Sequence, residues 1–212
     1  MSPRRAAALG AGDRTLRDHL IATAERMIAE RGTAGLTVRA IAREAGVADG
    51  VLYNHFADKE ELLAHALWAH AESVMRPLGP LPEPGDGTVE ENLRAYVAYG
   101  LALHHGLLPA LTGLVGRPAV LARFAALSGG GGTWNERLAS YLRGERDLGR
   151  LAPDARVEAA ASMIVGACHE PVLSLLFQGQ GLAHRVPPEA VDDLVAAVLN
   201  GLAPHLTTPS PP

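Results

Sequence analysis

The sequence contains one cysteine, one lysine and few aromatic residues in a chain of 212. Its single cysteine, Cys168, excludes an internal disulfide and fits an intracellular protein. Because aromatic residues make up only 4% of the chain, the core must be built mainly from alanine, leucine and valine, which suits closely packed helices better than a sheet. We therefore expect an all-α protein with room for one medium domain or two small ones.

Motifs of common enzyme classes are absent as well. A phosphate-binding loop needs a lysine after its glycines, yet the only lysine is Lys59, so the glycine run at 129–132 is not such a loop. No Gly-x-Ser-x-Gly nucleophile motif is present. Cys168 and His169 are adjacent and would point about 100° apart on a helix, so they do not form a nucleophile–base pair. The nine histidines include no His-x-x-x-His pair, and we expect no catalytic residue, no metal site, no cofactor and no enzyme.

No apolar run approaches about 20 residues, and residues 1–12 hold no apolar stretch long enough for a signal peptide. We therefore expect a cytoplasmic protein without a membrane partner. The net charge of −4 is unevenly divided, because residues 1–60 carry nine basic and eight acidic side chains while the remainder carries ten and fifteen. Any nucleic-acid contact made by the N-terminal part would depend on a few well-placed phosphate contacts rather than on bulk charge.

The most informative stretch runs from Leu36 to Leu63. Spacing i, i+3, i+4, i+7 places one apolar helical face at Val38, Ile41, Ala42 and Ala45. Thr37 precedes this face as a helix cap, and Gly46 follows it as a residue that tolerates the left-handed backbone at a helix end. Apolar anchors at Val47 and 51–52 predict a second short helix. Two short helices joined by a tight turn form a helix-turn-helix, whose second helix can enter the major groove of DNA.

The residues of this stretch also follow a known pattern. From Thr37 to Leu62 the chain reads T-V-R-x-I-A-x-x-A-G-V-x-x-G-x-L-Y-x-H-F-x-x-K-E-x-L. This pattern resembles the signature of the TetR (tetracycline repressor) family of bacterial transcription regulators, and the resemblance covers about residues 14–63. It implies a DNA-binding protein with an N-terminal three-helix helix-turn-helix domain and a C-terminal helical regulatory and dimerisation domain.

The resemblance also implies roles for individual residues. The residues expected to contact DNA are Thr37, Arg39, Ala48, Asp49, Gly50, Tyr53, Asn54, His55 and Lys59. Thr37, Arg39 and Lys59 would bind phosphates, the last together with free N–H groups at a helix start. Tyr53 and His55 would contact the DNA backbone or bases, and the remaining four occupy base-reading positions. For Tyr53 the alternative is core packing, but its hydroxyl group needs a partner, which favours phosphate contact.

Asp49 departs from the family pattern, where a neutral or basic residue is more common. A carboxylate near DNA is repelled by phosphates but can accept a hydrogen bond from cytosine N4. It can instead cap the second helix, where the helix dipole favours negative charge. We favour the cap.

Outside the helix-turn-helix the chain is also predicted to be mainly helical, and the whole chain is expected to divide into four parts. Further helices are expected at 13–31, 58–76, 88–105, 106–116, 118–127, 134–148, 153–177 and 187–202, with a proline- and glycine-rich break at 77–87. The expected parts are a flexible arm at 1–12, the helix-turn-helix domain at 13–62, a ligand-binding and dimerisation domain at 63–206 and a disordered tail at 207–212. The arm is either a plain disordered tail or carries arginines that touch the minor groove or a phosphate.

The helix at 153–177 is apolar on all sides and the helix at 187–202 is strongly apolar, so a second subunit is expected to bury them. The resemblance implies the same homodimer, through 153–178 and 187–203. A two-fold dimer would match a two-fold symmetric operator in double-stranded DNA, with half-sites about 34–36 Å apart.

Polar and aromatic groups on apolar helix faces suggest a pocket for an unknown small-molecule effector. The candidate residues are His70, Tyr96, Tyr99, His104, Trp134, His169, Glu170 and Phe177. Glu170 precedes Pro171, which is expected to kink the helix, and it either lines the pocket or forms a structural ion pair with Arg123 or Arg137.

The function predicted from these features is transcriptional regulation, as a repressor released from its operator by the effector. One alternative is a regulator that needs no ligand. Another is an all-α binding protein whose helix-turn-helix has lost its affinity for DNA, which the acidic Asp49 and the nearly neutral N-terminal part would explain.

Overall fold

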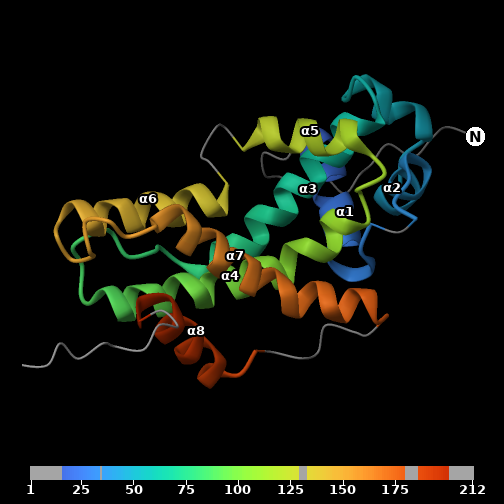
Figure 1. Ribbon diagram of the computed structural model, residues 1–212. Helices are drawn as coiled ribbons and strands as arrows, with labels where there is room; N and C mark the ends of the chain where they lie inside the picture. The colour runs from blue at the N-terminus through green and yellow to red at the C-terminus, as the bar shows by residue number, and fades with distance from the viewer. Residues whose placement is uncertain (1–15, 34, 129–132, 180–185, 201–212) are drawn as a thin grey trace, which may run out of the picture. The chain divides into compact units, whose positions relative to one another are not determined.

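The computed structural model describes residues 16–33, 35–128, 133–179 and 186–200, and these ranges contain helices but no strand (Figure 1). The helices are α1 (Leu16–Arg31), α2 (Val38–Ala45), η1 (Asp49–Asn54), α3 (Lys59–Met75), η2 (Arg76–Leu78), α4 (Val89–Thr112), α5 (Pro118–Leu127), α6 (Trp134–Asp147), α7 (Val157–Phe177) and α8 (Pro188–Asn200), where η marks 3₁₀ helices. The predicted all-α fold is confirmed. The expected arm at 1–12 and tail at 207–212 lie outside the described residues.

The chain forms two compact units. The first joins the residues up to 79 with 102–132, and the second joins 80–101 with the residues from 133 onward. The segments 63–79 and 102–128 therefore share a unit with the helix-turn-helix, although the sequence placed them in the ligand-binding domain. The functional boundary at residue 62 stays a prediction.

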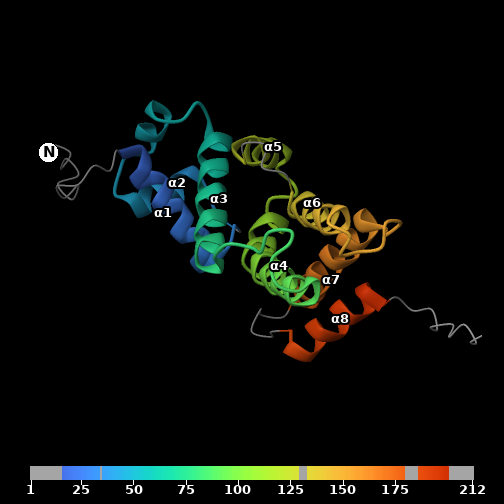
Figure 2. The same cartoon turned by 90° about the vertical axis from the view of Figure 1, so that its left-hand side faces the viewer.

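The first unit is organised around α3, which packs against α1 and against α5 (Figure 2). Its core is made almost entirely of aliphatic side chains, as the low aromatic content requires, and includes Leu20, Met27, Ile28, Leu36, Ile41, Leu52, Phe56, Leu62, Leu63, Leu67, Leu114 and Val120. Thr23 is buried in α1 because its hydroxyl group donates to the His19 carbonyl at 2.8 Å. The buried face of α1 consists of Leu20, Thr23, Ala24, Met27 and Ile28.

Helix α4 corrects one prediction, because a single helix replaces the two expected at 88–105 and 106–116. Gly106 and Pro109 lie inside it, where proline cannot donate a helical hydrogen bond. Contacts within the first unit hold this part of the helix in place. His70 Nε2 lies 3.1 Å from the Gly106 carbonyl, and the Thr33 hydroxyl donates to the Ala110 carbonyl at 3.2 Å. A β-carbon at Gly106 would lie 2.7 Å from a Val74 methyl, so the close approach of α3 requires glycine there.

In the second unit, α7 packs against α6 and also contacts α8. It buries one face, formed by Val157, Ala161, Ile164, Cys168 and Val172. The opposite face is open, with Met163 60% and Phe177 82% exposed. The helix continues through Pro171 to Phe177, although proline removes one of its backbone hydrogen bonds.

By length and composition alone, α7 is also long and apolar enough to cross a membrane, which corrects the expectation that no such segment exists. Only 22% of its most apolar window is buried. Together with the open face of α7, this low burial means that the second unit leaves apolar side chains exposed.

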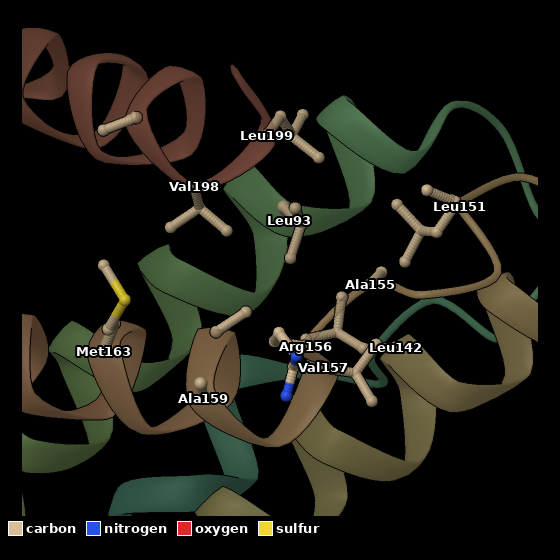
Figure 3. A pocket seen from close by; sticks show the side chains of 13 residues that line it. Leu93, Leu142, Leu151, Ala155, Arg156, Val157, Ala159, Met163, Val198 and Leu199 are labelled. Atoms are coloured by element: carbon tan, nitrogen blue, oxygen red, sulfur yellow. The ribbon is translucent and has the colours of Figure 1, made fainter. Parts of the chain in front are cut away.

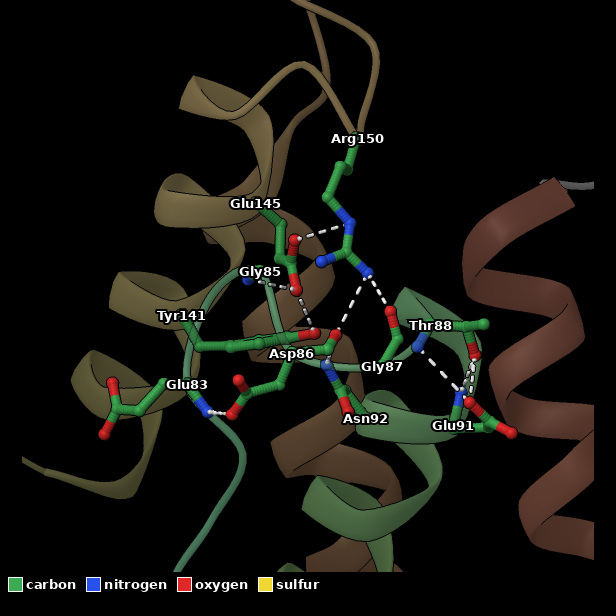
Figure 4. A network of polar contacts seen from close by, with 10 residues as sticks. All are labelled: Glu83, Gly85, Asp86, Gly87, Thr88, Glu91, Asn92, Tyr141, Glu145 and Arg150. Atoms are coloured by element: carbon green, nitrogen blue, oxygen red, sulfur yellow. Dashed lines mark hydrogen bonds and ion pairs between the residues drawn. The ribbon is translucent and has the colours of Figure 1, made fainter.

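The connection before α4 is fixed to α6 by a buried carboxylate (Figure 4). Glu145 is fully buried, and one of its oxygens accepts from the Tyr141 hydroxyl at 2.7 Å and from the Gly85 N–H at 3.4 Å. The other oxygen lies 3.3 Å from Arg150 Nε, and the Arg150 guanidinium donates to the backbone carbonyls at 86–87. Because a buried charge is stable only when it is paired and hydrogen-bonded, this network specifies the path of the chain into α4.

Candidate nucleic-acid interface and effector region

Helix α2 has the ends that its sequence predicts. The Thr37 side chain accepts from the Ala40 N–H at 3.1 Å, and this bond caps the N-terminus of the helix. Gly46 ends the helix with φ of 72°, in the left-handed region where glycine has no steric cost. Ile41 and Ala42 are buried, so the opposite side of α2, which carries Arg39, faces outward.

The second element of the helix-turn-helix is η1, a 3₁₀ helix rather than the α-helix expected. Only Leu52 is buried in its six residues, which gives the segment a single apolar anchor. Runs of 3₁₀ helix beyond three or four residues are uncommon because their hydrogen-bond geometry is poorer. We therefore attribute the position of this segment mainly to the packing of Leu52, and of Phe56 just after it, in the core of the first unit.

The favoured interpretation of Asp49 as a cap is wrong. The N-cap position of η1 is Ala48, and no side chain caps the helix there. Asp49 is the first residue of η1, so its charge does lie at the helix start, but its carboxylate accepts from Arg39 Nε at 3.2 Å. This ion pair joins α2 to η1, and 87% of the Arg39 and 51% of the Asp49 side chain are exposed.

The start of α3 is held by charged residues that the sequence analysis did not single out. Asp58 caps the helix by accepting from the Glu61 N–H at 2.9 Å, and it forms a two-point ion pair with the Arg123 guanidinium. Glu61 in turn accepts from the Ala57 N–H at 2.7 Å and from Arg17 at 2.9 Å. The D-x-x-E spacing at 58–61 is a capping signal in the sequence, whereas the two arginines come from distant segments.

The nine residues predicted to contact DNA lie at the surface of the first unit. All except His55, which is half-buried, are exposed. Tyr53 is 60% exposed, so core packing is not its role, whereas Phe56 is buried and its ring lies 4.7 Å below the Arg17 guanidinium. Lys59 is the first residue of α3, as expected, and lies 3.6 Å from Glu60. The exposed set therefore comes from the start of α2, η1 and the start of α3.

Three of the predicted effector residues meet in the second unit. The Trp134 ring stacks on Tyr99 with centroids 4.9 Å apart and lies 5.7 Å from Tyr96, which stacks on Tyr141 at 4.5 Å. The Tyr96 hydroxyl donates to the Pro82 carbonyl at 3.2 Å, and burial raises the pKa of Tyr96 to about 12. These rings pack on one another, with Tyr96, Trp134 and Tyr141 buried and Tyr99 half-buried.

The other five predicted effector residues do not join this cluster. His70 and His104 are buried and belong to the first unit. In the second unit, His169 is half-buried and burial lowers its pKa, while Phe177 is exposed. Glu170 is exposed as well and therefore needs no buried partner. Of the two arginines expected to pair with it, Arg123 binds Asp58.

A cleft of about 390 Å³ opens elsewhere in the second unit, where α4, the 151–156 turn, α7 and α8 converge (Figure 3). Its lining is apolar apart from Arg156 and consists of Leu93, Leu142, Leu151, Ala152, Ala155, Arg156, Val157, Ala159, Ala160, Met163, Ala197, Val198 and Leu199. None of the eight predicted effector residues lines it. Sequence reasoning missed this cleft because it looked for polar groups, whereas the lining is aliphatic.

The Cys168 thiol is buried in the second unit, and its sulfur lies 3.8 Å from the Val97 carbonyl. Burial raises the pKa of Cys168 to about 12. The thiolate is the reactive form of cysteine, so this side chain is an inert core thiol at neutral pH. Among the described residues, no group of three or more histidine, cysteine or acidic side chains is arranged to hold a metal ion.

The first unit is an all-α domain with a helix-turn-helix, the motif that places a helix in the major groove of DNA. Residues 20–66 match the model of the family described as bacterial regulatory proteins, tetR family. These residues carry the helix-turn-helix domain of this family, as the motif between Thr37 and Leu62 implied.

Characterised relatives are similar over the N-terminal part. The HTH-type transcriptional repressor KstR2 of Mycobacterium tuberculosis is 49% identical over 51 residues, which are 24% of this chain and 26% of the repressor. The HTH-type transcriptional repressor NemR of Escherichia coli is 30% identical over 80 residues, which are 38% of this chain and 40% of the repressor. The similarity thus spans less than half the length of either repressor.

Solved structures share the fold over nearly the whole chain. The fatty acid degradation regulator FadR from Bacillus halodurans matches with a TM-score of 0.62 and 22% identity, over 90% of this chain and 98% of the regulator. FadR from Bacillus subtilis, in complex with stearoyl-CoA, matches with a TM-score of 0.59 and 20% identity, over 87% of this chain and 98% of the regulator. At these identities the likeness shows the fold, with its N-terminal helix-turn-helix and C-terminal helical part.

Proposed function

We propose that this protein is a homodimeric, cytoplasmic transcriptional repressor that binds a two-fold symmetric operator and is released from it by a small-molecule effector. The observation that carries the proposal is the exposed surface of a tetR-family helix-turn-helix, formed by the starts of α2 and α3 and by η1. Its role is regulatory rather than catalytic. The repressors KstR2 and NemR, which resemble this part of the chain, support repression rather than activation.

In this proposal the DNA contacts divide by chemistry. Arg39 and Lys59 bind phosphates of the DNA backbone. The oxygen of the Thr37 hydroxyl caps α2, and its proton can be donated to a further phosphate. The exposed hydroxyl of Tyr53 and the ring of His55 contact the backbone or bases. Ala48, Asp49, Gly50 and Asn54 occupy the base-reading positions. A few contacts of this kind fit a domain that is only weakly basic.

The homodimer would form through 153–178 and 187–203. The open face of α7, with Met163 and Phe177, supports this proposal, and so does α8, in which Val195 is the only buried residue. The same surface argues against a membrane-spanning α7. A spanning helix must leave the folded unit, whereas α7 contributes five core residues to it. A second copy of the chain covers the open face without losing them.

The effector would bind in the second unit and favour a conformation in which the two helix-turn-helix domains of the dimer no longer match the spacing of the operator half-sites. The apolar cleft beside α8 supports an effector with a large apolar part, and the FadR structure that contains stearoyl-CoA shows such a ligand on the same fold. The Trp134 indole N–H, which does not line the cleft, supports a separate polar contact, because it is buried and has no acceptor among the described residues. For the predicted residues Tyr96, Tyr99 and His169, contact with an effector requires movement of the aromatic cluster or of α7.

Selection of random duplex DNA by the purified full-length protein, followed by sequencing, tests the function. We expect enrichment of a two-fold symmetric site, bound with a Kd of about 10⁻⁸ to 10⁻¹¹ M. Lys59→Gln should weaken binding to all sequences alike and reduce the slope of log K against log salt by about 0.9, the value for one phosphate. Arg137→Gln, which removes an exposed charge in the second unit, serves as the control and should leave both unchanged. If the folded, dimeric protein enriches no sequence, it is not an operator-binding repressor.

A further inference from the structure

The ion pair between Arg39 and Asp49 lies within the surface expected to meet DNA, and stability does not account for it. Arg39 is the second residue of α2 and Asp49 is the first residue of η1. Both side chains are more than half exposed, and only one contact, of 3.2 Å, joins them. Exposed pairs of this kind contribute little to folding. A carboxylate at this place also repels phosphates, so its presence weakens DNA binding unless it performs another task.

The geometry of the contact suggests that task. Asp49 binds Arg39 through Nε, which carries one of the five N–H groups of a guanidinium. The four N–H groups on the two terminal nitrogens can still donate to phosphate oxygens. An arginine that extends freely into solvent loses its rotamer freedom when it binds DNA, whereas an arginine already held at Nε loses less.

We propose that Asp49 is a positioning residue for Arg39: its carboxylate fixes the guanidinium across the turn between α2 and η1, so that the terminal nitrogens meet a DNA phosphate. Asp49 thus acts through Arg39 and neither reads a base nor caps η1. The inference rests on the proposed DNA-binding function and adds a residue whose charge is opposite to the one expected at such a surface.

The test is a double-substitution cycle on the full-length protein. Asp49→Asn, Arg39→Gln and the double variant are compared with the wild type for binding to a random-sequence duplex at low salt. This probe is chosen because a phosphate contact does not depend on sequence, so no operator is needed. Thermal melting of all four proteins provides the structural control, and the melting temperatures should agree, since the pair is exposed.

We expect Asp49→Asn to weaken binding between about two- and tenfold, the ordering cost of one long side chain, although it removes a negative charge. In the Arg39→Gln background the same substitution should have no effect or should strengthen binding, because only the repulsion remains. Asp49→Glu, which keeps the carboxylate, should restore most of the affinity. Glu44→Gln is the matched control. It removes a carboxylate from another ion pair of the same unit, 3.1 Å from Arg26, and should not weaken binding.

Three results would overturn the proposal. Stronger binding by Asp49→Asn in both backgrounds would mean that Asp49 only repels DNA. An equal loss in both backgrounds would separate its action from Arg39. A change confined to one base pair in selected DNA would make it a base-reading residue. If the wild-type protein bound neither random nor selected duplex, the DNA-binding function itself would fail and the positioning role with it.

Discussion

At the residue scale, charged and aromatic side chains around Phe56 tie the start of α3 to α1. The Arg17 guanidinium lies over the Phe56 ring and binds Glu61, and the His65 ring lies 6.5 Å from that of Phe56. Burial lowers the pKa of His65, the positive charge of Arg17 lowers it further, and the nearby Glu61 opposes both effects. His65 is therefore held in its neutral form.

This lowered pKa predicts how stability depends on pH. Between the folded pKa and the ordinary value of about 6.5, the unfolded chain binds a proton that the folded chain does not. The contribution of His65 to stability is thus complete above pH 6.5 and is lost as the pH falls from there through the folded pKa. His169, whose pKa is lowered by burial, acts in the same direction. Urea unfolding between pH 8 and pH 5 should show this decline, and His65→Gln should make it shallower. A stability that rises on acidification over this range would contradict the assignment.

At the element scale, the N-terminus of α3 is the point where the segment proposed to face DNA is attached to the rest of the first unit. Asp58 caps the helix and is bound by Arg123 of α5, which packs along α3. The pair with Arg123, followed by the Glu61 N–H bond, lowers the pKa of Asp58. The position of Lys59 and of the segment before it therefore depends on a residue more than 60 positions away in the chain.

Substitutions of Asp58 and Arg123 separate the cap from the ion pair. Asp58→Ala removes both and should lower the Tm by about 2–5 °C, the scale expected for loss of a helix cap in a chain of this size. Arg123→Gln removes only the ion pair and should have a smaller effect. Asp58→Asn keeps a cap acceptor and should resemble Arg123→Gln. Scanning calorimetry of the three variants gives this order, and equal losses for Asp58→Ala and Asp58→Asn would show that the cap contributes nothing.

At the scale of the whole molecule, the apolar surface of the second unit is the feature that a single chain leaves unexplained. Helix α7 has one buried face and one open face, and Val195 is the only buried residue of α8. A carboxylate placed in a covered apolar interface is costly because it loses water without gaining a partner.

Met163→Glu should therefore raise the dissociation constant of the homodimer by about 100-fold or more and weaken operator binding with it. Val115→Glu is the matched control, since Val115 is 68% exposed but lies in the first unit, outside the proposed interface. Sedimentation measured over a range of concentrations follows the dimer. A wild-type chain that is monomeric at micromolar concentration, or a Met163→Glu protein that dimerises normally, would contradict the proposed interface.

Much of the helix-turn-helix could be predicted from interactions between residues close together in the sequence. The capping threonine, the apolar face at spacing 3 and 4 and the glycine at the helix end are short-range signals, and α2 follows them residue by residue. The same holds for the buried face of α7, because its periodicity extends over five turns. The family motif added the positions expected to face DNA, and eight of these nine residues are exposed.

What only the tertiary structure decided are contacts between segments far apart in the chain. Helix α4 continues past Pro109, where its Gly106 carbonyl contacts His70 and its Ala110 carbonyl accepts from Thr33, and no local propensity predicts these contacts. Asp49 lies at a helix start, as expected, yet its partner is the arginine on the preceding helix rather than its own backbone. The aromatic residues that suggested a pocket pack on one another, and the cleft is lined by aliphatic side chains without a recognisable pattern. Sequence periodicity identifies which face of a helix is buried, whereas the identity of the side chains that meet there depends on how the helices pack.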